Sequence, residues 1–337
     1  MEQLTAAIYS YLTTSPGSNF RDRPVTVVAA WEGRQNLLWR VTADGHDAVV
    51  KLYLDAGQAR GRRQYDGQSL FSPLGIAPPP LWFDRYPTGL ARQVLVYHWA
   101  PGATLAGDDS AQLAQLAQVV AQVHRGDPAE VRRFCPNPVN LDYLWRVIAG
   151  GLPPIQQWLA AQPATAFQSL FSQLTANAQA LVEATLPLWQ QVAPTPVHGD
   201  LRLENAVYGL GTVQLLDWEL FGLGDPAYDV AAFLQQSQTA LSDDASVMWL
   251  EHYLAHFEQP NLAQRIGVYQ RIMPLQSVCY LLDGLRHYVT SDPTSIRENR
   301  TMLAATLDAA FAQTMAALSI DSNKYSTVIA EFLDQLM

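Results

Sequence analysis

The pattern of apolar residues changes at Ala100-Pro101-Gly102, and this change restricts the chain to a two-part fold. Before this break, the apolar runs are short and are separated by turn residues, as is typical of β-strands. After it, apolar residues recur every three or four positions, as on the buried face of an α-helix. The sequence therefore predicts an α+β protein with a small β-rich lobe at residues 1–99, a hinge at 100–105 and a larger, mainly helical lobe at 106–337.

Five apolar runs in the first part predict the strands of a five-stranded antiparallel sheet. One polar helix over 56–71 is expected between the third and fourth strands, and the prolines of 77–80 end helix formation after it. A tight turn, Asp44-Gly45-His46, joins the second strand to the third. The predicted strands cover residues 25–30, 36–43, 47–53, 80–83 and 93–99.

In the second part, helical spacing alternates with one β-like island at residues 196–218. The apolar residues before the island predict helices at 113–124 and 167–174. Nearly everything after residue 240 reads as helix, with a possible kink at Pro274. The predicted helices there cover residues 245–257, 262–288, 295–317 and 326–336.

The composition excludes several classes of protein. The 337 residues include 21 basic and 31 acidic side chains, so the net charge of −10 argues against a nucleic-acid binder, which needs a basic face. Two cysteines cannot form a disulfide framework or a cysteine-based zinc site. No stretch reaches the ~18 apolar residues of a membrane span, and the N-terminus lacks the features of a signal peptide. We therefore expect a cytoplasmic protein with no nucleic-acid or membrane partner.

The β-like island carries the residues that indicate chemistry. It reads Val197-His198-Gly199-Asp200-Leu201-Arg202-Leu203-Glu204-Asn205, and Asp217 follows at the end of another apolar run. An Asp followed five residues later by Asn puts a base and an amide oxygen on one loop, and a second Asp adds a hard oxygen ligand. Phosphoryl transfer from ATP needs such a carboxylate near the attacking hydroxyl, and oxygen ligands that hold magnesium against the phosphates. Taken singly, each segment could instead be a structural turn with a capping Asp.

With Asp217-Trp218-Glu219 and Gly224-Asp225-Pro226-Ala227-Tyr228-Asp229, this loop resembles the aminoglycoside phosphotransferase and choline kinase superfamily. The resemblance implies a protein-kinase-like bilobal fold, ATP and Mg²⁺ as cofactors, and a small molecule as substrate. It implies that Asp200 is the catalytic base and that Asn205 and Asp217 are the magnesium ligands. Residues 1–99 then form a nucleotide-binding lobe, and the acceptor site lies on the helical lobe. The superfamily segment at 224–229 braces the catalytic loop, and Glu219 either reaches magnesium through water or braces the same loop.

The first lobe contains Lys51 in the middle of an apolar run, Val49-Val50-Lys51-Leu52-Tyr53. An ammonium group buried there needs an anionic partner, and the phosphates of ATP are such a partner. The alternative is a lysine that faces solvent from an edge strand. In protein kinases this lysine pairs with a Glu of the following helix, and here Asp66 is the best acidic candidate.

Two further segments lie where the resemblance places nucleotide contacts. The turn that contains Gly33 and ends at Asn36 occupies the position of a phosphate-covering loop, although its single glycine is also compatible with a plain hairpin. The end of the fifth strand resembles the lobe-joining hinge. Its backbone is expected to hold adenine around Tyr97 to Trp99.

The acceptor is predicted from acidic and aromatic residues on the later helices. Glu251 lies in one such stretch, whereas Tyr280 and Asp283 are three residues apart and share a helix face. Carboxylates attract amines, and aromatic faces attract cations. We therefore expect an amine-bearing alcohol of the aminoglycoside, choline or amino-alcohol type. A neutral sugar or nucleoside is the alternative, because acidic residues on exposed helices are ordinary and aromatic residues are usually core.

Two other activities compete with a small-molecule kinase. A non-catalytic nucleotide-binding pseudokinase is disfavoured because Lys51, Asp200, Asn205 and Asp217 are all present. A protein kinase is disfavoured for two reasons. Gly199 replaces the usual Arg before the base, and the chain lacks the long activation segment that protein kinases have after the second Asp.

Overall fold

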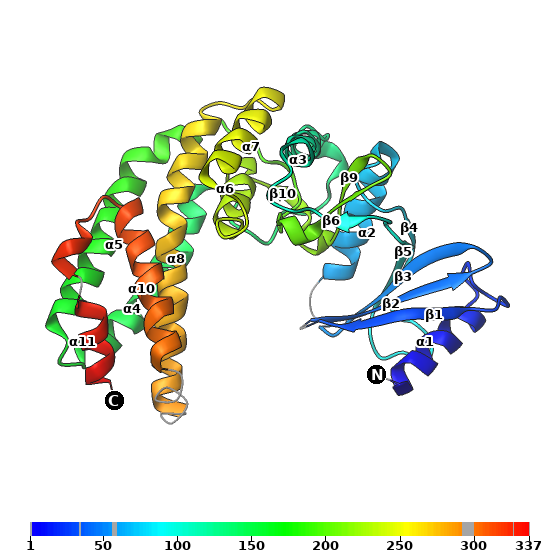
Figure 1. The fold of residues 1–337 in the computed structure, drawn as a ribbon, viewed down its shortest axis with the longest axis horizontal. Coiled ribbons are helices and arrows are strands. Elements are labelled where there is room, and N and C mark those ends of the chain that lie inside the picture. The colour runs from blue at the N-terminus through cyan, green and yellow to red at the C-terminus, as the bar shows by residue number, and fades with distance from the viewer. Residues whose placement is uncertain (1, 34, 56–58, 292–299, 326, 337) are drawn as a thin grey trace. The chain divides into compact units, whose positions relative to one another are not determined.

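The computed structural model of the chain describes every residue except 1, 34, 56–58, 292–299, 326 and 337 (Figure 1). The chain forms two compact units. The first unit holds both the β-rich part and the β-like island, and the lobe boundary at 100–105 stays a prediction. The first unit comprises Met1–Asn137, Pro194–Asp229 and Phe233–Glu258, and the second comprises Pro138–Ala193, Val230–Ala232 and Gln259–Met337.

The main sheet of the first unit has five antiparallel strands, which confirms the prediction from sequence. The strands follow the order β1-β2-β3-β5-β4, so β3 lies at the centre. Lys51 is therefore not on an edge strand, and it is only 2% exposed. The strands are β1 (Thr26–Glu32), β2 (Asn36–Ala43), β3 (His46–Tyr53), β4 (Pro80–Asp84) and β5 (Val94–His98).

A helix covers each face of this sheet. Successive side chains of a strand point to opposite faces, so both faces carry apolar side chains that are buried by a helix. Helix α1 (Glu2–Thr14), which the sequence analysis did not predict, packs on the face that carries Trp39 and Val50. Helix α2 (Arg60–Phe71) lies over the opposite face, where its Tyr65 packs against the cluster of Val49, Tyr53, Leu95 and Tyr97. The same alternation puts Lys51 on the α2 face. Residues 56–58 of the predicted helix lie outside the described residues.

Three more helices begin in the first unit, each after an N-cap residue that the sequence encodes. Helix α3 (Ser110–His124) is capped by Asp109, and α7 (Asp243–His256) is capped by Ser242. Helix α6 (Pro226–Gln236) begins with Pro at its first position after the cap Asp225.

The predicted β-like island is confirmed as two small sheets that hold the loop of residues 198–205, the candidate catalytic loop. One sheet pairs β7 with β10, and the other has the order β6-β8-β9. The loop follows β7 directly and ends at β8, so both of its ends are fastened by strands. These strands are β6 (Ala103–Thr104), β7 (Thr195–Val197), β8 (Ala206–Gly209), β9 (Thr212–Leu215) and β10 (Gly222–Gly224).

The second unit is helical in the part that the structure describes. Its α4 was not predicted, because Pro153 and Pro154 lie inside it and proline is unfavourable within a helix. Pro274 likewise lies inside α8, which continues past it. The predicted helix starts at 295–299 and 326 lie outside the described residues. None of the described helices has the length and apolar character required to cross a membrane. The helices are α4 (Leu141–Ala160), α5 (Thr165–Thr185), α8 (Leu262–Ser291), α10 (Arg300–Ala317) and α11 (Val328–Gln335).

Candidate active site

Lys51 is the buried cation around which the site is built. Its Nζ donates to Asp217 Oδ1 at 2.8 Å, forms an ion pair with Glu219, and donates to Gln64 Oε1 at 3.0 Å. Burial opposes the charged form of Lys51, but the two carboxylates outweigh burial and raise its pKa above the usual value. Lys51 therefore stays protonated and can present its charge to a phosphate group.

The expected pairing of Lys51 with Asp66 is wrong, because Asp66 lies on a different side of α2. Its carboxylate accepts hydrogen bonds from Arg62 Nε and Arg133 NH1, each at 2.8 Å. Gln64 contacts Lys51 in its place, and its Oε1 also accepts a hydrogen bond from Tyr53 at 2.7 Å. Two residues along a helix correspond to about 200° of rotation, so Gln64 and Asp66 cannot both face the sheet.

Gln64 and Asp66 should therefore differ in their effect on nucleotide binding. We expect Gln64→Leu to weaken AMP-PNP binding several-fold and to lower the free energy of unfolding by about 1–3 kcal/mol, because the buried Tyr53 hydroxyl loses its acceptor and Lys51 loses one of its three partners. Asp66→Asn should leave AMP-PNP affinity within about twofold, since it does not contact Lys51. Calorimetric titration and denaturant unfolding measure both effects. A larger loss of affinity in Asp66→Asn than in Gln64→Leu would contradict this assignment.

Glu219 supplies the carboxylate that the helix was expected to provide. It is 4% exposed and pairs with Lys51, with Arg60 NH1 at 3.0 Å, and with Asn36 Nδ2 at 2.9 Å. From the sequence, Glu219 is expected to reach magnesium through water or to brace the loop, and its pairing with Lys51 is not predicted. A buried lysine beside a D-W-E segment was the available signal, because a buried ammonium and a buried carboxylate each need a partner.

The catalytic loop brings Asp200 and Asn205 together, as the D-x-x-x-x-N spacing predicts. Asn205 Nδ2 donates to Asp200 Oδ2 at 3.1 Å and to its backbone oxygen at 2.9 Å. Arg202 donates to Asp200 Oδ1 from Nε at 2.9 Å and from NH2 at 2.7 Å. The Asp200 carboxylate is thus held from two sides, in a fixed orientation, beside the metal-ligand candidate Asn205.

His198 orients the loop as a neutral hydrogen-bonding residue. Its Nε2 donates to the Leu216 carbonyl at 2.8 Å, and its Nδ1 accepts from the Asp200 N–H at 3.3 Å, a pattern that requires a single ring proton. Burial lowers the pKa of His198 despite the nearby charge of Asp229. Asp229 accepts the backbone N–H groups of His198 at 3.1 Å and Gly199 at 3.0 Å, and so braces the loop from α6.

Gly199 explains why this loop lacks the usual Arg before the base. Its φ is +86°, a conformation that is unfavourable for residues with a Cβ. A Cβ at this position would also lie 2.8 Å from the Cβ of Leu220. The turn that presents Asp200 therefore requires glycine.

Asp217 reaches the same site from the end of β9. It adopts a left-handed conformation with φ 57°, which Asp tolerates better than most residues. The preceding residue, Leu216, donates its N–H to the Asn205 carbonyl at 2.7 Å, so the two metal-ligand candidates lie on hydrogen-bonded segments. Burial would raise the pKa of Asp217, but the charge and hydrogen bond of Lys51 lower it below the usual value. Asp217 is therefore ionised at neutral pH.

The donor set of Asn205 and Asp217 suits Mg²⁺. The Asn205 amide nitrogen donates to Asp200. The Oδ1 atom of Asn205 accepts no hydrogen bond from the described residues and is free to bind a metal ion. The Asp217 side chain is 35% exposed, so it combines a hydrogen bond to Lys51 with access from solvent. The described residues contain no cluster of three His, Cys, Asp or Glu side chains that could enclose a metal. Mg²⁺ commonly binds to one or two protein ligands and completes its shell with phosphate oxygens and water.

The turn after β1 is joined to the site through Asn36. Gly33 donates its N–H to the Asn36 carbonyl at 2.9 Å, which closes a short hairpin, and the Asn36 side chain binds Glu219. A Cβ on Gly33 would lie 2.9 Å from Asn36 Oδ1, so glycine fits this tight turn. Arg34 of the predicted phosphate-covering loop lies outside the described residues.

The predicted hinge residues take part in the main sheet through part of their backbone. Tyr97 pairs with Val49 of β3 and Pro80 of β4, and the Trp99 N–H donates to the Asp47 carbonyl at 3.0 Å. The Trp99 N–H is thus engaged in the sheet, and the adenine contact expected from the backbone around Tyr97 to Trp99 stays a prediction. The Tyr97 phenol lies near Lys51, and burial raises its pKa to about 12.

The residues predicted to bind the acceptor are divided between the two units. Glu251 is exposed on α7 in the first unit. Tyr280 and Asp283 line one pocket of about 320 Å³ in the second unit, where Asp283 Oδ1 binds Arg286 NH2 at 2.7 Å. The aromatic neighbours of Glu251, Trp249 and Tyr253, are fully buried and belong to the core.

A family model for the phosphotransferase enzyme family matches residues 26–271, which is most of the chain. The chain belongs to the phosphotransferase enzyme family. The match spans Lys51, the catalytic loop and Asp217, and it confirms the resemblance found in the sequence.

Solved structures confirm the kinase-like α+β fold of this phosphotransferase family member. A choline/ethanolamine kinase family protein from Mesorhizobium loti is 16% identical, with a TM-score of 0.64, and the match covers 98% of this chain and 100% of that one. Choline kinase LicA from Streptococcus pneumoniae is 16% identical, with a TM-score of 0.58 and coverage of 95% and 99%. A thermostable mutant of the aminoglycoside phosphotransferase APH(4)-Ia, in ternary complex with ADP and hygromycin B, is 17% identical, with a TM-score of 0.58 and coverage of 87% and 94%.

Proposed function

We propose that this protein transfers the γ-phosphoryl group of ATP to a hydroxyl group of a small, amine-bearing molecule, in a reaction that depends on Mg²⁺. The observation that carries the proposal is the arrangement of Lys51, Asp217, Asp200 and Asn205 within one compact unit. The family match and the ADP-bound state of the similar aminoglycoside phosphotransferase support a nucleotide as the phosphoryl donor.

Asp200 is the group that receives the substrate proton. The acceptor hydroxyl oxygen forms a bond to the γ-phosphorus, the bond from that phosphorus to the bridging oxygen breaks, and ADP leaves. The hydroxyl proton passes to the Asp200 carboxylate, whose orientation is held by Arg202 and Asn205.

Lys51 holds the nucleotide phosphates, and Asn205 and Asp217 are the side chains that would hold Mg²⁺. When bound, Mg²⁺ offsets the negative charge of the phosphates. Glu219 keeps Lys51 in position through a second ion pair, with Arg60 and Asn36 as its own partners. The Gly33–Asn36 turn covers the phosphates in this proposal.

The acceptor is proposed to bind through Tyr280 and Asp283, which line one pocket of the second unit, whereas Glu251 of the first unit is not part of this pocket. The pocket lined by Tyr280 and Asp283 also has the apolar side chains of Ile148 and Ile155. Its carboxylate and aromatic ring are suited to a protonated amine. Hygromycin B, an aminoglycoside bound by one structural relative, is an amine-bearing compound of this kind.

A neutral sugar or nucleoside is the second candidate acceptor, and the ion pair of Asp283 favours it. Asp283 pairs with Arg286 at 2.7 Å, so its charge is partly compensated. A cationic acceptor would have to exchange for this partner, whereas a neutral hydroxyl compound would not.

Asp283→Asn distinguishes the two acceptor classes. For an amine-bearing acceptor we expect KM to rise about two- to fivefold with kcat kept, because the Asp283 side chain is 47% exposed and its attraction is screened. Steady-state ADP release measures both constants. Asp308→Asn, an exposed change on α10, is the matched control. An unchanged KM for every amine tested would contradict a role for Asp283.

The reaction itself is tested by magnesium-dependent ADP release over a panel of acceptors. The panel includes aminoglycosides, choline, ethanolamine, homoserine, methylthioribose and neutral sugars, and the phosphorylated product is identified by mass spectrometry. We expect ADP release that requires both Mg²⁺ and an amine-bearing acceptor. Turnover of neutral acceptors alone would favour the second candidate, and nucleotide binding without any product would indicate a pseudokinase.

A further inference from the structure

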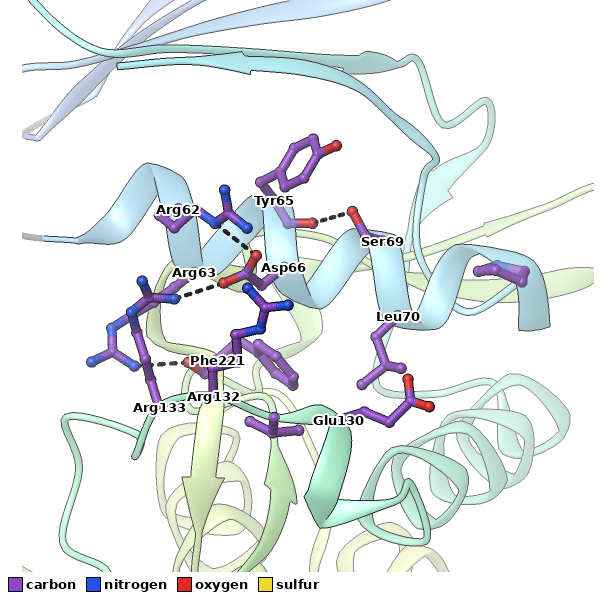
Figure 2. A pocket seen from close by; sticks show the side chains of 12 residues that line it. Arg62, Arg63, Tyr65, Asp66, Ser69, Leu70, Glu130, Arg132, Arg133 and Phe221 are labelled. Atoms are coloured by element: carbon purple, nitrogen blue, oxygen red, sulfur yellow. Dashed lines mark hydrogen bonds and ion pairs between the residues drawn. The ribbon is translucent and has the colours of Figure 1, made fainter.

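The first unit contains a pocket of about 470 Å³, which we call the second pocket to distinguish it from the pocket of Tyr280 and Asp283 (Figure 2). Its lining includes none of the residues proposed for phosphoryl transfer. One wall is α2, which contributes Arg62, Arg63 and Asp66. The other wall is the segment of residues 130–133, which contributes Arg132 and Arg133. The volume falls within the usual range of small-molecule sites.

Positive charge gathers in this pocket, although the whole chain carries a net charge of −10. Four arginines line it, Arg62, Arg63, Arg132 and Arg133, against two acidic side chains, Asp66 and Glu130. In Figure 2 the arginines come from both walls and converge near Asp66, whereas Glu130 lies beside Leu70 at the other end. The pocket as a whole therefore has an excess of two positive charges, and its arginine end, where Asp66 is the acidic side chain, has an excess of three. This charge favours an anionic ligand.

The existing contacts leave donors available to a ligand. Asp66 is shared by Arg62 and Arg133, and Arg63 NH1 donates to the uncharged carbonyls of Phe134 at 2.6 Å and Phe221 at 3.0 Å. Arg132 forms no hydrogen bond or ion pair with any residue that the structure describes. Burial lowers the pKa of Arg63, and the charge of Arg133 lowers it further, as expected for like charges held together.

We propose that this pocket binds a compact organic phosphate, a small molecule with one phosphate group and a short apolar body. The planar guanidinium groups of Arg132 and Arg133 match the geometry of phosphate oxygens, with which they can form paired hydrogen bonds. The apolar body packs against the side chains of Leu70, Pro73 and Phe221, which line the same pocket.

The same elements connect this pocket to Lys51. Helix α2 presents Arg63 to the pocket, while its Gln64 contacts Lys51 and its Arg60 contacts Glu219. Phe221 lines the pocket only two residues after Glu219. A ligand that alters the position of α2 or of this segment therefore alters the partners of Lys51, and its binding is coupled to nucleotide affinity.

Phenyl phosphate is the probe for binding, and phenol is its uncharged counterpart. Calorimetric titrations use protein saturated with Mg²⁺ and AMP-PNP, so that the probe cannot report on the nucleotide site. We expect phenyl phosphate to bind, phenol not to bind, and Arg132→Ala to weaken phenyl phosphate binding about tenfold or more. Arg132→Ala should fold normally, since it removes no hydrogen bond or ion pair with a described residue, and thermal unfolding verifies this. Arg92→Ala, an exposed arginine elsewhere in the first unit, should bind as the wild type does.

Equal affinity of phenyl phosphate for wild type and Arg132→Ala, or equal binding of phenol, would overturn the site. The coupling is measured separately as AMP-PNP affinity with and without saturating phenyl phosphate. We expect a change of about threefold or more in wild type and no change in Arg132→Ala. An unchanged AMP-PNP affinity in wild type would overturn the coupling. Catalytic activity enters neither measurement, so failure here is distinct from failure of the proposed reaction.

Discussion

Asp200→Asn is expected to lower turnover by at least ~10²-fold while nucleotide binding is kept, the usual scale for loss of a general base. The amide cannot accept the hydroxyl proton, but it has nearly the same shape as the carboxylate. Asn205 can still donate to its oxygen, so the loop should keep its structure. Steady-state ADP release with the cognate acceptor measures the loss, and calorimetric titration with AMP-PNP measures nucleotide binding.

Two comparisons make this result specific to Asp200. Asp308→Asn makes the same chemical change at an exposed position on α10 and should keep wild-type turnover. Arg202→Ala removes the ion pair at Asp200 Oδ1 without removing the carboxylate, and should lower turnover less than Asp200→Asn. Wild-type turnover of Asp200→Asn with any cognate acceptor would refute its role as the base.

Lys51→Ala should weaken AMP-PNP binding about tenfold or more, because a charge-assisted contact to phosphate is lost. The variant should also be less stable, since Asp217 and Glu219 lose their shared counterion. Breaking a buried ion pair costs about 3–5 kcal/mol, and we expect the lower end here because Asp217 is partly exposed and Arg60 still pairs with Glu219. Calorimetry and denaturant unfolding measure the two effects.

The only other lysine of the chain, Lys324, provides the matched control. It is exposed, lies in the second unit, and contacts the Tyr325 ring. Lys324→Ala should therefore keep both AMP-PNP affinity and stability near wild-type values. Equal nucleotide binding by Lys51→Ala and wild type would remove Lys51 from the proposed phosphate site.

Features that depend on short stretches of sequence can be predicted without the structure. The alternation of apolar residues identified the five strands of the sheet and placed Lys51 in the third of them. The spacing of Asp200 and Asn205 put both side chains on one loop, where they are hydrogen-bonded. Such features are decided within a few residues of chain, by strand periodicity and turn geometry, so the sequence alone determines them.

Features that depend on which side chains meet across the fold were decided only by the tertiary structure. Glu219 and Gln64, rather than Asp66, contact Lys51, because the rotation of α2 against the sheet selects one helix face. The four arginines of the second pocket come from segments about 70 residues apart in the chain, so no local pattern reveals that they share a cavity. Charge pairs over such separations depend on packing, and packing follows from the whole set of contacts rather than from any one segment.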